Sequence, residues 1–116
     1  MQERIIKKSG QYIVDVNVIT FQGENEIVAY SPALQISSYG ETKQDAEHAL
    51  GENIAIFMDY ATSKNTLIED LLNLGWTIKK KPDFLFIPPP YSTEDIVVDI
   101  ATDTYEMFEH HFAIPA

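Results

Sequence analysis

The stretch QYIVDVNVITF, residues 11–21, alternates side chains with a period of two and predicts a β-strand with two distinct faces. One face is expected to be fully apolar and consists of Tyr12, Val14, Val16 and Val18. The other face places Asp15 and Asn17 among apolar neighbours.

The segment that follows predicts two more strands. Residues 22–25 form a turn, and residues 26–31 read as a second strand that pairs back as a hairpin. Pro32 interrupts this strand because proline cannot donate a hydrogen bond to the ladder. Residues 34–39 predict a short third strand, closed by Gly40. The chain is therefore expected to open with a three-stranded antiparallel meander.

A long amphipathic helix is predicted to begin at Thr42. The Thr42 hydroxyl can cap the free amides of the first turn, and Asp45 follows three residues later, as in a capping box. The side chains expected on the sheet are Ala46, Ala49, Leu50, Asn53, Ile54, Phe57, Met58 and Ala61. The side chains expected on the opposite side are Glu47, Gly51, Glu52 and Asp59. The helix should thus cover one face of the meander.

The remaining elements complete an α+β fold. A second helix is expected from Thr66 to a left-handed stop at Gly75, followed by a strand at residues 76–78 that returns to the sheet. Residues 93–101 fit a helix through their capping residues or a strand through their β-branched run, and both remain open. Residues 105–114 predict a last strand. We expect a domain over residues 1–81 and an acidic, proline-broken extension over residues 82–116 that packs on the domain or on a partner chain.

Composition limits the classes of function. The chain has 116 residues, no cysteine and a net charge of -10, of which -7 falls in residues 82–116. Without cysteine there is no disulfide, thiolate metal site or cysteine nucleophile. The N-terminus lacks the apolar stretch of a signal peptide, so a cytoplasmic protein is expected. Nucleic-acid binding needs a basic face, and this sequence offers only Lys79–Lys81, so a basic protein is the better electrostatic match.

Few residues suggest catalysis. His110 and His111 are neighbours in a strand and should point to opposite faces, which disfavours a shared metal site. Asp15 is favoured as a solvent-facing or interface residue, although metal-dependent nucleases hold carboxylates in such positions. The alternative is an RNase H-like nuclease that uses Asp15 with Glu24 or Asp59. We expect no catalytic residues, no bound metal and no cofactor.

The C-terminal third carries the candidate contact surface. The run Phe84–Ile87 is strongly apolar and is followed by three prolines at residues 88–90, so it either packs along its own domain or covers another chain. The residues expected at a partner or dimer interface are Phe84, Phe86, Ile87, Tyr105, Phe112 and Ile114.

The stretch VAYSPALQISSYGETKQDAEHAL, residues 28–50, resembles a pattern of the HicB-like antitoxin family of type II toxin–antitoxin systems. The matching positions are Tyr30, Pro32, Leu34, Gly40, Thr42, Asp45 and Ala46. The resemblance covers residues 12–78. It implies a compact, partly RNase H-like fold that lacks the catalytic carboxylates.

The resemblance also implies a function and partners. Such proteins bind a small basic RNA-cleaving toxin, here a HicA-like protein, and mask its active site. A homodimer or higher homo-oligomer is expected. Many members carry a C-terminal DNA-binding unit, but residues 79–116 contain no basic recognition element, so direct nucleic-acid binding is not expected. The alternative outside toxin–antitoxin function is a homo-oligomer with a structural or regulatory role.

Overall fold

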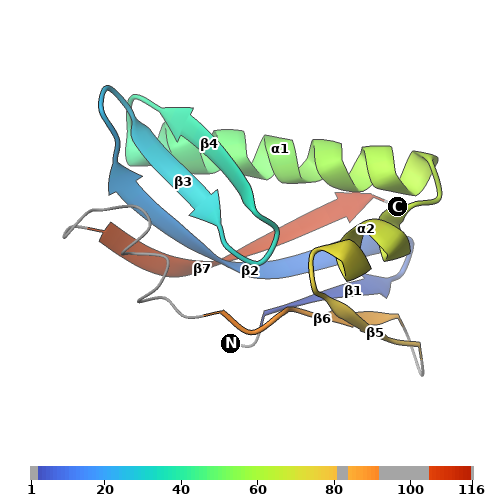
Figure 1. Ribbon diagram of the computed structural model, residues 1–116. Coiled ribbons are helices and arrows are strands. Elements are labelled where there is room, and N and C mark those ends of the chain that lie inside the picture. Colours follow the sequence, from blue (N-terminus) through green and yellow to red (C-terminus); the bar gives the residue numbers. More distant parts are fainter. Residues whose placement is uncertain (1–2, 81–83, 92–104, 116) are drawn as a thin grey trace.

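The structure is a computed structural model and describes residues 3–80, 84–91 and 105–115. It is a mixed α+β fold with an antiparallel sheet and two helices, which confirms the predicted fold class at that level (Figure 1). In chain order the elements are β1 (Arg4–Lys8), β2 (Gln11–Gln22), β3 (Ile27–Ser31), β4 (Ile36–Gly40), α1 (Lys43–Ser63), α2 (Leu67–Asn73), β5 (Thr77–Lys79), β6 (Leu85–Ile87) and β7 (Tyr105–Pro115). Residues 93–101, for which helix and strand both remained open, lie outside the described residues.

The long strand β2 organises the sheet. It pairs with β7 along nearly its whole length, from Gln11 opposite Pro115 to Phe21 opposite Tyr105. It also pairs with β1 over residues 11–15 and with β3 over residues 19–22. Because a strand has only two edges, β1 and β3 share the edge that β7 leaves open, one at each end. β2 is therefore the central strand to which three others are joined.

Strand β1 was not predicted from the sequence, and a tight turn explains its position. Ser9 and Gly10 join β1 to β2 with positive φ angles of 53° and 78°. A two-residue turn with positive φ at both positions matches the right-handed twist of paired strands and so favours a hairpin. β1 also pairs with β6 through Ile5 opposite Phe86, and β6 pairs with β5. The apolar run around Phe86 is thus a strand of the domain's own sheet.

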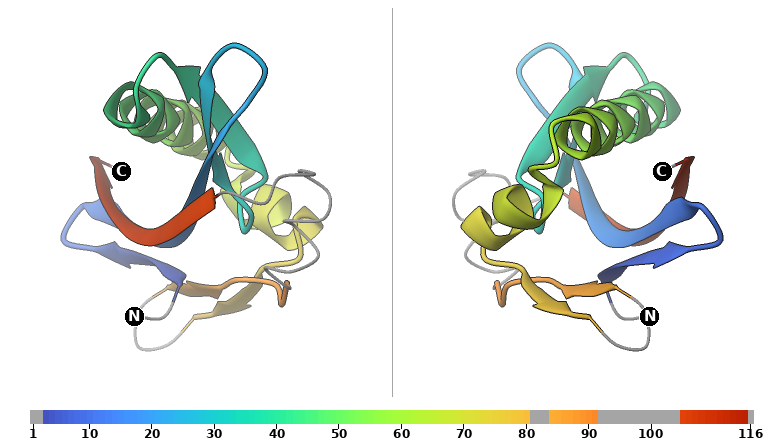
Figure 2. Two further views of the ribbon diagram at one scale, coloured as in Figure 1. Left: turned by 90° about the vertical axis from the view of Figure 1, so that its left-hand side faces the viewer. Right: turned by 90° about the vertical axis from the view of Figure 1, so that its right-hand side faces the viewer.

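Helix α1 covers one face of the sheet, as the sequence predicted. The amide of Asp45 donates to the Thr42 hydroxyl at 3.1 Å, which is the expected cap. Viewed along the helix, β2 and β7 are strongly curved and α1 lies on their concave side (Figure 2). The core between them contains, among others, Val14, Val16, Val18, Ala46, Leu50, Ile54, Met58, Leu71, Trp76 and Phe86.

One flank of α1 differs from the prediction. Gly51 and Glu47 were expected on the solvent side, but both lie toward β7. A Cβ atom on Gly51 would come within 3.0 Å of a ring carbon of Phe112. The Glu47 carboxylate lies 3.6 Å from Nε2 of His110. The reason is that β7 extends the sheet beneath this flank, so residues that would face water on a three-stranded meander face a fourth strand.

The connection after α2 follows the predicted order. Gly75 has a φ of 95° and ends the helix, which confirms the left-handed stop. Trp76 is 1% exposed, and its indole Nε1–H donates to the carbonyl oxygen of Ala33 at 2.8 Å. The short strand β5 follows at residues 77–79. Trp76 thus fastens the C-terminal end of α2 to the segment between β3 and β4.

Candidate functional site

Asp15 lies at the centre of a polar row that crosses three strands. In the register of the sheet it stands opposite Arg4 on β1 and His111 on β7. Its carboxylate is 4% exposed, with Nδ1 of His111 at 2.5 Å and Nε of Arg4 at 3.5 Å. The prediction that Asp15 faces solvent or an interface is therefore wrong, because the carboxylate is buried between two cross-strand partners. Asp15 and His111 are therefore hydrogen-bond partners across the strands, and the His111 side chain remains 62% exposed.

The neighbouring histidines are separated by the sheet, as predicted. His110 lies on the side of α1, with the rings of Phe108 and Phe112 at centroid distances of 5.0 and 5.1 Å. His111 lies on the opposite side with Asp15. Within residues 3–80, 84–91 and 105–115, no cluster of three histidine or acidic side chains is arranged to hold a metal ion.

The acids of the nuclease alternative do not meet. Asp15 is in the middle of β2, whereas Glu24 is in the turn between β2 and β3. Asp59 is on an exposed position of α1, on the other side of the sheet from Asp15. A two-metal mechanism needs carboxylates that converge on one point, and these three lie on different parts of the fold.

A second polar group fills the gap between β1 and β3 on the edge of β2. The backbone amide of Asn17 donates to Oε2 of Glu3 at 2.9 Å, so a carboxylate takes the place of the missing strand. The Tyr91 hydroxyl donates to Oε1 of Glu3 at 2.6 Å and accepts from the Asn17 side-chain amide at 3.2 Å. Burial, and then the hydrogen bond to Glu3, raise the pKa of Tyr91. These hydrogen bonds satisfy the backbone amide of Asn17 at the point where neither β1 nor β3 pairs with β2. The network therefore has a structural role.

The predicted interface residues fall into three groups by exposure. Phe86 and Ile114 are 2% and 5% exposed and belong to the core of this chain. Their strands pair with β1 and β2, which covers them within the chain. Phe112 is half-buried against Gly51 of α1. The remaining three, Phe84, Ile87 and Tyr105, are between 38% and 39% exposed and remain accessible.

The outer face of α1 carries a feature that the sequence prediction missed. Ile56 and Tyr60 are 64% and 60% exposed, the highest values among the large apolar residues that the structure describes. The exposed acids Glu52 and Asp59 lie next to them on the same helix. The signal was present in the sequence, since Ile56 and Tyr60 are spaced four residues apart and lie outside the apolar stripe. We call these four residues the outer acidic face.

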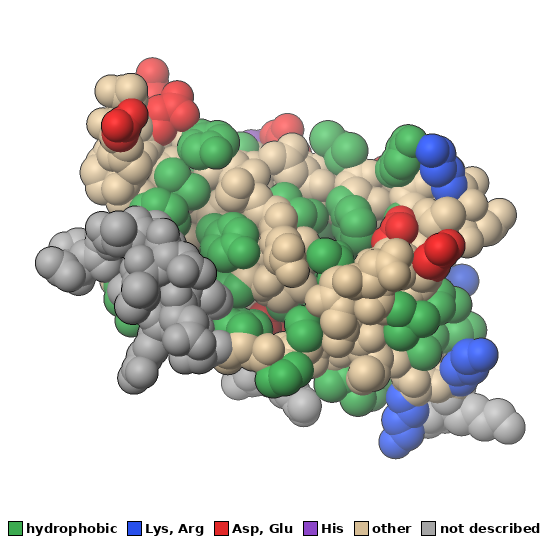
Figure 3. Space-filling view, viewed as in Figure 1, with side chains coloured by type: hydrophobic (Ala, Val, Ile, Leu, Met, Phe, Trp, Pro, Cys, Tyr) green, Lys and Arg blue, Asp and Glu red, His purple; other side chains and the backbone are tan. Residues whose placement is uncertain are grey.

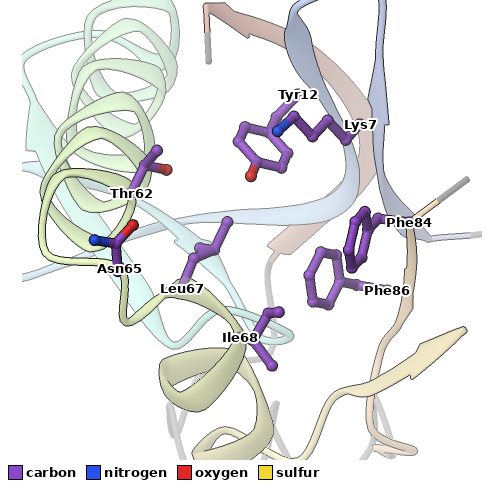
Figure 4. Close-up of a pocket in the computed structure, with 8 residues that line it drawn as sticks. All are labelled: Lys7, Tyr12, Thr62, Asn65, Leu67, Ile68, Phe84 and Phe86. Atoms are coloured by element: carbon purple, nitrogen blue, oxygen red, sulfur yellow. The ribbon is translucent and has the colours of Figure 1, made fainter. Parts of the chain in front are cut away.

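The fold also gathers basic side chains that are distant in sequence. Lys7 and Lys8 end β1, Lys64 caps α1, Lys79 ends β5, and Lys80 comes directly after it. In Figure 3 the Lys and Arg side chains in view lie at the end of the molecule where α1 ends. The sequence prediction found only the run at residues 79–81. A pocket of about 400 Å³ opens at this end, between the start of α2 and the strands β1 and β6 (Figure 4).

Comparisons with protein-family models, curated proteins and solved structures found no match. The evidence for function therefore lies in the residues and geometry of this chain. Among the described residues, no helix has the length and apolarity needed to cross a membrane.

Proposed function

We propose that the protein is a HicB-like antitoxin, which binds a small basic RNA-cleaving toxin and neutralises it by masking the active site. The observation that carries this proposal is the outer acidic face of α1, where two large exposed apolar side chains lie beside two carboxylates. Apolar anchors with acids around them suit a basic protein partner, because the anchors supply affinity and the charges supply orientation.

The geometry of the shared pattern supports the family resemblance. Gly40 lies so close to the start of α1 that a Cβ atom would be 2.4 Å from the backbone nitrogen of Ala46. Thr42 caps the helix through the amide of Asp45. Ala46 is fully buried on the inner face of α1. The glycine, threonine and alanine of the pattern thus each have a physical role at the junction of β4 and α1.

The overall charge supports the same class of partner. The chain has a net charge of -10, and a basic protein would be steered toward it over a distance that shortens as salt increases. Glu52 and Asp59 belong to this excess of acids and lie on the face that we assign to the partner. Binding should therefore be faster and tighter at low ionic strength.

The test begins with identification of the partner. The tagged protein is captured from its host at low salt, and co-purifying proteins are identified by mass spectrometry. A small basic RNA-cleaving protein encoded beside it is the expected result. The purified pair is then assayed for binding and for inhibition of RNA cleavage.

Matched variants connect the binding to the outer acidic face. Ile56→Arg should weaken binding by about tenfold or more, because a cation replaces a central apolar anchor. Leu72→Arg makes the same change at an exposed residue of α2 and should leave binding within about twofold. If the two variants bind the partner with equal affinity, the outer acidic face of α1 is not the contact surface.

A homo-oligomer without a toxin is the second candidate, and the exposure of Ile87 favours it. Ile87 is 38% exposed at the end of β6, beside the three prolines. If capture returns only this chain as a defined oligomer, Ile87→Asp should shift it to the monomer in light scattering. Phe86 is unsuitable for this test because it is buried in the core.

A further inference from the structure

The pocket near the end of α1 is assembled from four separate parts of the chain. Its lining residues are Lys7, Tyr12, Thr62, Asn65, Leu67, Ile68, Phe84 and Phe86. In Figure 4, Phe84 and Phe86 stand side by side on one wall, Thr62 and Asn65 form another, and Leu67 and Ile68 lie between them. Its volume of about 400 Å³ is within the usual range for small-molecule sites.

The exposure of the lining residues distinguishes a floor from a rim. Tyr12, Leu67 and Phe86 are 8%, 6% and 2% exposed and form a buried floor that is apolar apart from the Tyr12 hydroxyl. Ile68 and Phe84 are 41% and 38% exposed, so two large apolar side chains stand in water at the mouth. A ligand that covered them would remove this apolar surface from water.

The polar groups of the pocket favour an anion. Lys7 is the one charged residue among the described lining residues, in a chain whose net charge is -10. Its Nζ lies 5.8 Å from the centre of the Tyr12 ring, beside the aromatic part of the pocket. Thr62 and Asn65 add neutral hydrogen-bonding groups on the other wall. The pocket thus combines three aromatic rings with a single cation.

We propose that this pocket is a binding site for a small aromatic monocarboxylate. The aromatic body lies against Phe84, Phe86 and Ile68, where offset and edge contacts between rings are favourable. The carboxylate faces the Lys7 ammonium group, which supplies charge complementarity. The site is separate from the outer acidic face of α1, so this inference stands or falls independently of the proposed function.

The test uses naphthalene-2-carboxylate as the anionic probe and naphthalene-2-carboxamide as its neutral counterpart. Binding is followed by two-dimensional amide NMR of the isotopically labelled full chain. We expect saturable shifts at Lys7, Tyr12, Ile68 and Phe84, with a Kd of about 1 mM or tighter for a ligand of this size. The carboxamide should bind about fivefold more weakly, as expected for the loss of a partly screened ion pair.

Adjacent lysines provide a matched pair of variants. Lys7→Met removes the charge in the pocket but keeps an unbranched side chain, and it should weaken the carboxylate about fivefold while leaving the carboxamide unchanged. Lys8→Met removes the same charge from the neighbouring position, whose side chain points to the other face of β1. It should change the Kd of either probe by less than about twofold.

Three results would overturn the proposal. The first is the absence of saturable binding by wild-type protein at about 10 mM probe, well above the affinity expected for a ligand of this size. The second is a set of shifts that maps to residues away from the pocket. The third is equal weakening of the carboxylate by the two lysine variants, which would assign the effect to overall charge.

Discussion

Replacement of Gly40 by alanine tests the junction between β4 and α1. The new Cβ atom would lie 2.4 Å from the nitrogen of Ala46, 2.7 Å from Cβ of Asp45 and 2.8 Å from its carbonyl carbon. Ordinary contacts begin at 3.4 Å, so the strand and the first turn of the helix must separate by about 1 Å. Two of the three neighbours are backbone atoms, so rotation of a side chain cannot relieve the clash.

The expected cost follows from what the shift disturbs. Overpacking of this kind costs about 1–3 kcal/mol, and loss of the Thr42 cap adds about 1 kcal/mol. Alanine also restricts the unfolded chain, which returns about 0.4–1 kcal/mol. The free energy of unfolding should therefore fall by about 1–3.6 kcal/mol in the Gly40→Ala variant.

The assay is urea unfolding at equilibrium, followed by the fluorescence of Trp76, the single tryptophan, which is 1% exposed in the fold. Gly10→Ala is the matched control. A Cβ atom on Gly10 would meet no atom within 4 Å, but its φ of 78° strains an alanine by about 1 kcal/mol. A Gly40→Ala variant that is as stable as wild type would refute the close approach of β4 and α1.

Three further predictions concern the polar contacts of the fold. Trp76→Phe removes the donor to the buried Ala33 carbonyl and should cost about 1–3 kcal/mol in urea unfolding followed by far-UV circular dichroism, since this variant has no tryptophan. A double-mutant cycle with Asp15→Asn and His111→Ala should give a coupling energy of about 1 kcal/mol, reduced by the exposure of His111; additive effects would contradict the pairing. Because the fold raises the pKa of Tyr91, its contribution to stability is complete below the unfolded value near 10 and is lost as pH rises above it. Tyr91→Phe should therefore make stability fall less steeply with alkaline pH, as measured by unfolding at pH values of about 8–11.

The elements that depend on local pattern could be predicted from the sequence. Strand β2 could be predicted from its alternating side chains. The start of α1 could be predicted from Thr42, whose hydroxyl accepts a hydrogen bond from a backbone amide in the first turn. The end of α2 follows from Gly75, whose positive φ is easily reached only by glycine. In each case the decisive residues are neighbours in the chain, so a short window contains the whole signal.

The missed elements depend on distant segments. β1 has only two apolar residues, Ile5 and Ile6, and its strand is stabilised by pairing with both β2 and β6. The same holds for Asp15, whose partners Arg4 and His111 are brought to it by separate strands. A window around Asp15 shows an acid in an apolar strand but contains no information on what neutralises it.

The candidate surfaces also divide into those that neighbouring residues determine and those that distant segments determine. The outer acidic face could have been found from the four-residue spacing of Ile56 and Tyr60, because side chains four residues apart lie on the same face of a helix. The sequence could not show whether Phe86 contacts its own domain or another chain, since an apolar run is the same in both cases. The gathering of Lys7 and Lys64 at one end depends on where two elements finish in space.

The full-length pairing of β2 with β7 has a consequence for how the chain folds. During synthesis β2 appears first, and its partner on this edge is made only after β3, β4 and both helices. Until then a long row of backbone amides and carbonyls on β2 has no strand beside it, and such a row is a template for pairing with another chain. The closure of this edge joins distant parts of the chain, which makes it a slow step. A β7 strand from a second molecule would fit the same edge, so crowded nascent chains are expected to exchange this strand before they finish folding.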